Sequence, residues 1–206
     1  MQDPGYNITM TLLDKDIREP LFDFLELQYG EVRFLEEKNM GRSRADILMV
    51  LRDAVYGIEI KSDADTYARL ARQVKDYNRF CDCCIAAVGV KHAYHIAEHI
   101  PDWWGIITVD TEQGRPDFYI QREAKPNPKR SLAAKLSVLW RPELAHILAV
   151  KGLPKYKEKS AAFVRSRILE KIPEEELHGL ISAELFERDY TTIAEEIASW
   201  KKTHGR

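Results

Sequence analysis

A helical pattern lies between two strand-like segments in the middle of the sequence, and this order constrains the fold more than any other feature. Residues 55–62 alternate apolar and polar side chains, which is the period of a strand with one apolar face. Residues 64–80 space apolar side chains by three or four positions, as an amphipathic helix does, and residues 84–90 form a short apolar stretch typical of a buried strand. This order predicts an α/β fold in which a mixed sheet carries helices on both faces.

Further elements extend this pattern on both sides. Residues 16–30 have the periodicity of a helix, and Asp16 with Glu19 resembles a capping box at its start. The other predicted elements are a strand at 45–51 in a hairpin with 55–62, a short helix at 92–100, and strands at 104–110 and 117–123. Residues 1–124 are therefore predicted to form one α/β domain.

The remaining part of the chain has a different composition. Pro126 and Pro128, flanked by cations, interrupt both periodicities, so residues 125–206 are predicted to form a separate module, which is helical in pattern. Residues 125–171 contain 12 Lys or Arg and 3 Asp or Glu, a balance of +9 in a chain whose net charge is -2. A basic surface is expected on this module.

Targeting signals and cysteines indicate the compartment. The N-terminal residues lack the basic start and apolar core of a signal peptide, and no stretch reaches the roughly 18 to 20 apolar residues of a membrane span. Cys81, Cys83 and Cys84 are odd in number and too closely spaced for a disulfide framework. These features predict a cytoplasmic protein with reduced thiols.

The predicted strand at 55–62 carries an acid and a base on one face. Glu59 and Lys61 are two residues apart, so their side chains point the same way from alpha carbons roughly 6.5 Å apart. Asp46, at the start of the preceding strand, would supply a second carboxylate. Two carboxylates and the carbonyl of Ile60 make an all-oxygen site, which suits Mg²⁺ or Mn²⁺, and Lys61 could stabilise charge on a phosphate.

These residues resemble a known superfamily. The order "RAD", hairpin, "GIEIK" and a helix with Gln73 and Tyr77 in the pattern Q-x-x-x-Y is similar to the PD-(D/E)XK nucleases, in the branch of Holliday-junction resolvases and RecB-type nucleases. The segments "GRSRADILMV", "YGIEIKSDADT", "LARQVKDYNRF" and "IPDWWGI" are similar to a bacterial and phage family of PD-(D/E)XK-like proteins, over roughly residues 12–190.

The resemblance implies a restriction-endonuclease-like fold and a Mg²⁺-dependent deoxyribonuclease. The metal ligands that it implies are Asp46, Glu59, the main-chain carbonyl of Ile60 and an acid carried on a helix, either Glu36 or Glu37. The other site residues that it implies are Lys61, which orients the water or stabilises the transition state, Gln73, which contacts the site or the DNA backbone, and Tyr77, one helical turn later.

The basic module is a candidate for nucleic-acid contacts. Residues 143–169 are similar to the helix–extended–helix of SAP-type DNA-binding modules, although few positions carry the likeness. A solvated charged face is the alternative. The cations expected to contact DNA phosphates are Arg44, Arg69, Lys155, Lys157, Lys159, Arg165 and Arg167.

Other interpretations compete with these. The protein could be a DNA-binding or regulatory protein that keeps the fold without turnover, or a protein partner could supply the catalysis. Zinc could be held by His92, His95 and His99 with the nearby cysteines, although cysteine is often buried simply for packing. The tandem tryptophans at 103–104 favour core packing over base stacking. Residues 187–202 have the pattern of an amphipathic helix for packing or dimerisation.

Overall fold

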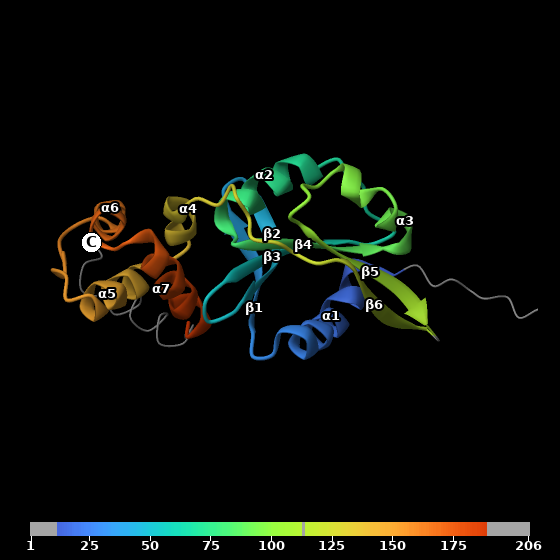
Figure 1. The fold of residues 1–206 in the computed structure, drawn as a ribbon, viewed down its shortest axis with the longest axis horizontal. Helices are drawn as coiled ribbons and strands as arrows, with labels where there is room; N and C mark the ends of the chain where they lie inside the picture. The colour runs from blue at the N-terminus through green and yellow to red at the C-terminus, as the bar shows by residue number, and fades with distance from the viewer. Residues whose placement is uncertain (1–11, 113, 189–206) are drawn as a thin grey trace, which may run out of the picture.

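The computed structural model describes residues 12–112 and 114–188. A six-stranded sheet has its strands in sequence order, with parallel β3–β4 and β4–β5 pairs and antiparallel pairs elsewhere (Figure 1). The fold class is therefore the predicted mixed α/β fold. The strands are β1 (Arg33–Met40), β2 (Ser43–Val50), β3 (Val55–Lys61), β4 (Cys83–Gly89), β5 (Gly105–Glu112) and β6 (Arg115–Arg122).

Helices cover both faces of the sheet, and a group of helices lies at one end of the molecule (Figure 1). α1 lies on one face, whereas α2 and α3 lie on the other, and α4 to α7 gather beside β1, β2 and β3. The helices are α1 (Asp14–Tyr29), α2 (Leu70–Phe80), α3 (Val90–Ala93), the short 3-10 helix η1 (Ile96–Glu98), α4 (Leu132–Ser137), α5 (Arg141–Val150), α6 (Ala161–Lys171) and α7 (Glu174–Phe186).

The alternation along β3 divides the core into two layers. Ile58 and Ile60 face α1 in one hydrophobic cluster, whereas Val55 belongs to the cluster on the α2 side. Glu59 and Lys61 have the same parity as Val55, so their side chains also lie on the α2 side. The strand is buried on both faces, as the apolar pattern of a central strand indicates.

Two helix starts differ from the prediction. α1 begins at Asp14, and Asp16 lies inside its first turn, where its carboxylate accepts a hydrogen bond from the Leu13 N–H at 3.0 Å. The predicted capping box of Asp16 and Glu19 is therefore wrong. α2 begins at Leu70 rather than at 64, because the preceding residues form a turn in which Asp65 accepts hydrogen bonds from the Ser62 backbone and hydroxyl.

The segment at 92–100 is also broken, since α3 ends at Ala93 and η1 covers only Ile96–Glu98. The predicted helix 187–202 lies mostly outside the described residues.

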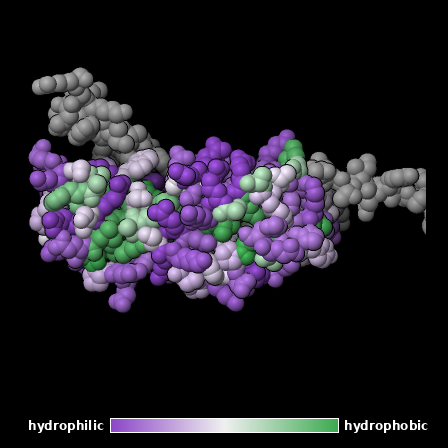
Figure 2. Space-filling view, turned by 90° about the horizontal axis from the view of Figure 1, so that it is seen from above, coloured by the Kyte–Doolittle hydropathy of each residue, from purple (hydrophilic) through white to green (hydrophobic). Residues whose placement is uncertain are grey.

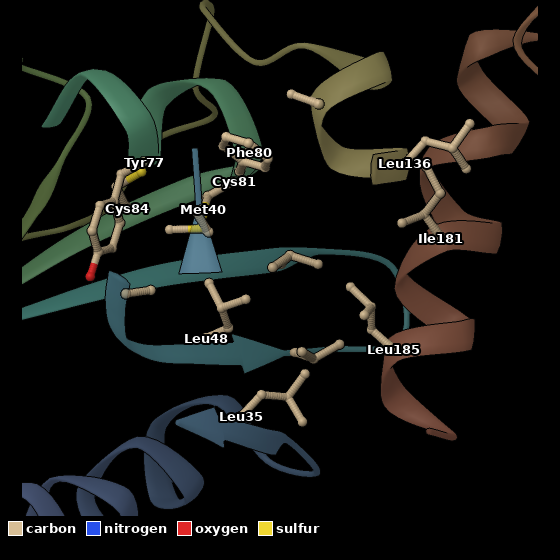
Figure 3. Packing of buried hydrophobic residues seen from close by; sticks show 14 of the residues in the cluster. Leu35, Met40, Leu48, Tyr77, Phe80, Cys81, Cys84, Leu136, Ile181 and Leu185 are labelled. Carbon is tan, nitrogen blue, oxygen red and sulfur yellow. The ribbon is translucent and has the colours of Figure 1, made fainter. Parts of the chain in front are cut away.

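The predicted linker is pinned to the sheet domain. Asn127 is buried, and its side-chain amide donates to the carbonyls of Asn78 and Cys81, both at 2.8 Å. Beyond it, Leu136 of α4 and Leu185 of α7 pack in the same cluster as the residues of β1 and β2 (Figure 3). The hydrophobic core on the α2 side therefore continues from the sheet into the C-terminal helices.

Candidate active site

The site begins where β2 and β3 separate. Their paired residues run from Val50 opposite Val55 to Ile47 opposite Ile58, and the pairing stops there. Next along β2 is Asp46, whose Oδ2 accepts a hydrogen bond from the Ile60 N–H at 2.9 Å. The carboxylate thus replaces the missing backbone acceptor. Because the N–H and C=O of one strand residue point to the same edge, the Ile60 carbonyl faces the side on which Asp46 lies.

Glu59 and Lys61 form a buried ion pair beneath α2. They are 0 % and 4 % exposed, and the Lys61 Nζ donates to Glu59 Oε1 at 2.5 Å. The same amine lies 3.5 Å from Oε1 of Gln73 on α2. Within the described residues, the second oxygen of Glu59, Oε2, is buried and has no hydrogen-bond partner. A buried carboxylate oxygen without a donor is costly, so this atom could accept a cation or a hydrogen-bond donor.

Tyr77 fixes the geometry of the strands rather than facing a substrate. Its ring is fully buried, and its hydroxyl donates to the Ile58 carbonyl at 3.0 Å and accepts from the Asp46 N–H at 3.1 Å. Burial raises the pKa of Tyr77 well above its ordinary value, so the phenol stays protonated. This one hydroxyl holds β2 and β3 together at the point where their ladder ends.

Gly57 makes room for this tyrosine. A Cβ at this position would lie 2.4 Å from Tyr77 Cδ1 and 2.6 Å from Cys81 Sγ. We expect Gly57→Ala to lower the free energy of unfolding by about 1–3 kcal/mol through overpacking, measured by urea denaturation. Gly179→Ala is the control, because a Cβ there meets nothing within 4 Å. Equal stability of Gly57→Ala and the wild type would contradict this account.

The carboxyl group of Asp46 is electrostatically strained. Burial first, and then the charge of Glu59, raise its pKa from 3.8 to about 7, although the Ile60 N–H and Lys61 act in the opposite direction. A cation bound between the two carboxylates would remove this repulsion. The raised pKa is therefore consistent with a cation site.

This pKa predicts a pH dependence of stability. Between pH 3.8 and about 7, the folded protein holds a proton on Asp46 that the unfolded chain has released. The free energy of unfolding therefore falls as the pH rises through this window, and Asp46→Asn removes that fall. We expect urea denaturation to show the variant gaining stability relative to the wild type from about pH 4 to about pH 8. Parallel pH profiles of the two proteins would contradict the shift.

Arg18 of α1 is a site residue that the sequence analysis missed. Its guanidinium donates to the Asp46 carbonyl at 3.0 Å and to Asp14 Oδ1 at 2.8 Å. It also lies 3.3 Å from Glu36 and 3.4 Å from Glu37. The i,i+4 spacing of Asp14 and Arg18 is visible in the sequence, but the contacts of Arg18 with β1 and β2 are not.

The predicted acid carried on a helix is wrong for both candidates. Glu36 and Glu37 lie on β1, a strand, and Glu37 has a positive φ of 55°. Glu37 pairs with Arg44 as well as with Arg18, so its charge is neutralised by two guanidinium groups.

The oxygen atoms at the site fit a hard divalent cation. Asp46 and Glu59 each have one oxygen engaged by the protein, which leaves Oδ1 and Oε2 for a ligand, with the Ile60 carbonyl on the same side. Within residues 12–112 and 114–188, no three His, Cys, Asp or Glu side chains are grouped to hold a metal. Mg²⁺ commonly binds through one or two carboxylates and completes its shell with water and substrate oxygens.

The absence of such a group in the described residues also disfavours the zinc alternative. His92 is buried, and its Nε2 lies 3.1 Å from the Ser62 carbonyl. The three cysteines are buried and unpaired with one another in disulfides. Trp104 is fully buried and donates to Asn78 at 2.8 Å, which confirms the packing interpretation for that tryptophan.

The predicted DNA-contacting cations fall into two sets. Arg165 donates to the carbonyls of Ser137 and Leu139 at 3.2 and 3.1 Å, so it braces the end of α4. Arg167 pairs with Glu170. The other predicted cations are exposed. Arg44 pairs with Glu37, and Arg69 lies just before α2. Lys155, Lys157 and Lys159 lie between α5 and α6.

Comparisons with other proteins give a family but no activity. The chain is similar to the structure of Pyrococcus furiosus SfsA in complex with Ca²⁺, with 14% identity over 57% of this chain and 67% of that one, and a TM-score of 0.36. This likeness is too small to transfer a fold or an activity. No curated protein matches. No helix of the described residues is long and apolar enough to cross a membrane. The family model for bacteriophage P4 protein cII matches residues 10–202, so the chain belongs to the bacteriophage P4 protein cII family.

Proposed function

We propose that this protein is a metal-dependent nuclease that hydrolyses DNA phosphodiester bonds at the site formed by Asp46, Glu59 and Lys61. The observation that carries this proposal is Glu59 Oε2, a buried carboxylate oxygen without a hydrogen-bond partner in the described residues, close to the partly buried carboxylate of Asp46 and the buried Lys61. Charged groups are costly to bury, and a carboxylate with a strongly shifted pKa beside a buried ion pair is a candidate functional site. The resemblance to PD-(D/E)XK nucleases at these same positions supports the proposal.

Each residue has a role that follows from its contacts. Asp46, Glu59 and the Ile60 carbonyl would hold Mg²⁺ or Mn²⁺, which when bound polarises a phosphate and lowers the pKa of water. Lys61 supplies the positive charge that a phosphate needs as negative charge develops on it. Gln73 orients the Lys61 amine through its side-chain oxygen, and Tyr77 fixes the backbone of Asp46.

Metal binding is the first test. At about pH 8, where Asp46 is ionised, Mn²⁺ is expected to raise the melting temperature of the wild type by mass action. Asp46→Asn should lose the Mn²⁺-dependent shift, whereas Asp23→Asn, an exposed carboxylate of α1, should keep it. Differential scanning fluorimetry measures all three proteins. An equal shift in all of them would place the Mn²⁺ elsewhere and contradict the assigned ligands.

Turnover needs a separate assay. Plasmid, linear, single-stranded and branched DNA are incubated with Mg²⁺ or Mn²⁺, and the products are separated on a gel. Metal-dependent cutting of any of these substrates supports the proposal. Metal binding without cutting of any of them would favour the alternative, a DNA-binding protein without turnover of its own. The ion pair of Lys61 with Glu59, which partly neutralises the site without a metal, is the observation in favour of that alternative.

A further inference from the structure

A cleft of about 620 Å³ lies between the sheet and the C-terminal helices. Leu35 of β1 and Leu48 of β2 line it on the sheet side, next to Leu185 of α7 (Figure 3). The residues that connect α4 to α5, from Ser137 to Pro142, line it on the helical side, together with Arg165 of α6. Its volume is within the range of clefts that hold small ligands, about 300–1,000 Å³.

The charges that line this cleft are mainly positive. Four cations contribute to its lining, and Glu37 is the single acid among its lining residues in the described chain. That acid already pairs with Arg18 and Arg44. The four cations are Lys38, Arg141, Arg165 and Arg188, of which Arg188 is paired with the buried Glu143.

Within residues 12–112 and 114–188, two of these arginines have a buried nitrogen atom without a hydrogen-bond partner. Arg141 uses Nη2 to donate to the Tyr156 carbonyl at 2.7 Å, but its Nη1 is buried without a partner. Arg165 uses Nη2 for two carbonyls, but its Nε is buried without a partner. A buried guanidinium nitrogen without an acceptor is costly. Both side chains line the same cleft, so an anion entering there would meet two positively charged guanidinium groups.

The cleft lies between exposed lysines and the candidate active site. The bond from Arg141 to Tyr156 ties the cleft to residues 155–159, where Lys155, Lys157 and Lys159 are exposed and form no ion pair in the described chain. On the other side, Glu37 of the cleft lies opposite Asp46, because its neighbours Glu36 and Lys38 pair with Ile47 and Ala45. In Figure 2, hydrophilic side chains surround the apolar areas on the end of the molecule that carries these helices.

We propose that this cleft binds the sugar-phosphate backbone of a nucleic-acid strand and leads it to Asp46. Arg141 and Arg165 contact phosphate groups inside the cleft, and the three lysines contact phosphates at its mouth. The apolar floor from β1 and β2 accommodates the sugar or base between two phosphates. This inference rests on the proposed function, because it assigns the path by which a nuclease substrate reaches the site.

The test measures binding in the Lys61→Ala background and without divalent metal, so that cleavage does not interfere. Fluorescence anisotropy gives the Kd of a labelled single strand and of a duplex at several salt concentrations. Adding Arg141→Gln is expected to weaken binding about tenfold and to reduce the slope of log K against log salt by about 0.7 to 0.9, one phosphate contact. Arg115→Gln, an exposed arginine of β6, is the matched control and should bind unchanged. Unchanged affinity and slope in Arg141→Gln would overturn the proposal.

A second measurement uses the wild-type chain, in case Arg141→Gln fails to fold. Acetylation of lysines is followed by mass spectrometry with and without DNA, in the absence of divalent metal. Lys155, Lys157 and Lys159 are expected to be protected by DNA, whereas Lys15, exposed on α1, is not. Equal labelling with and without DNA would overturn the proposal. Neither experiment needs cleavage. If DNA protects the three lysines from acetylation but the wild-type protein cuts no DNA, the nuclease function is contradicted and the proposed binding path is still supported.

Discussion

Replacing Lys61 by alanine is expected to lower the single-turnover rate of metal-dependent DNA cleavage by about 10²- to 10³-fold, the usual effect of losing one preorganised charge at a reacting group. The lysine is 4 % exposed and held by Glu59 and Gln73, so its amine has a fixed position beside the two carboxylates. In such a site a charge acts with little screening by water. The loss should be in the rate at saturating DNA rather than in the affinity for DNA.

The measurement is a quenched single-turnover assay with excess enzyme and Mg²⁺, on the DNA form that the wild type cuts. Lys15→Ala, which removes an exposed lysine of α1, is the control and should retain the wild-type rate. Lys61→Ala leaves Glu59 buried without its cation, so thermal melting must show that the variant is folded. Folded Lys61→Ala protein that cleaves at the wild-type rate would remove Lys61 from the proposed mechanism.

Lys135→Met is expected to lower the free energy of unfolding by about 3–5 kcal/mol, the cost of breaking a buried ion pair from one side. Lys135 is 1 % exposed, and its amine donates to Asp82 Oδ2 at 2.5 Å, to Ser182 Oγ at 2.9 Å and to the His178 carbonyl at 3.2 Å. Asp82 Oδ2 also accepts from the Val55 N–H, so this pair joins α4 and α7 to the start of β3.

Urea denaturation tests this prediction, with Lys125→Met as the control. Lys125 is exposed in the connection between β6 and α4, so its replacement should change the free energy of unfolding by less than about 0.5 kcal/mol. Adding Asp82→Asn to Lys135→Met should recover part of the lost free energy of unfolding, because the double variant no longer buries the Asp82 carboxylate without its cation. A loss below about 1 kcal/mol in Lys135→Met would mean that the pair does not hold the C-terminal helices to the sheet.

The positions of Asp46, Glu59 and Lys61 could be predicted because they depend on local periodicity. Two-residue alternation places Glu59 and Lys61 on one face of β3, and the hairpin brings Asp46 beside them without any knowledge of distant contacts. Gln73 was implied by the resemblance to PD-(D/E)XK nucleases rather than by periodicity, and α2 presents this residue to the Lys61 amine.

The helix boundaries could not be predicted as well. Asp65 and Ser62 form a local turn that competes with helix, and this delays α2 to Leu70 despite an apolar pattern that begins earlier. Asp16 has the spacing of a capping residue but lies within the first turn. In both cases a short polar side chain could form several local hydrogen bonds of similar energy, and the apolar pattern alone does not show which of them forms.

The sequence by itself determined the mixed α/β fold and the trio on β2 and β3, because strand and helix periods specify which side chains share a face. Only the tertiary structure decided the surroundings of that trio. Arg18 reaches it from α1, Arg165 is bonded to the end of α4 where it lines the cleft, and the cleft beside β1 exists because the C-terminal helices pack there. These contacts join residues far apart in sequence, and their energies depend on burial and geometry that no local pattern encodes.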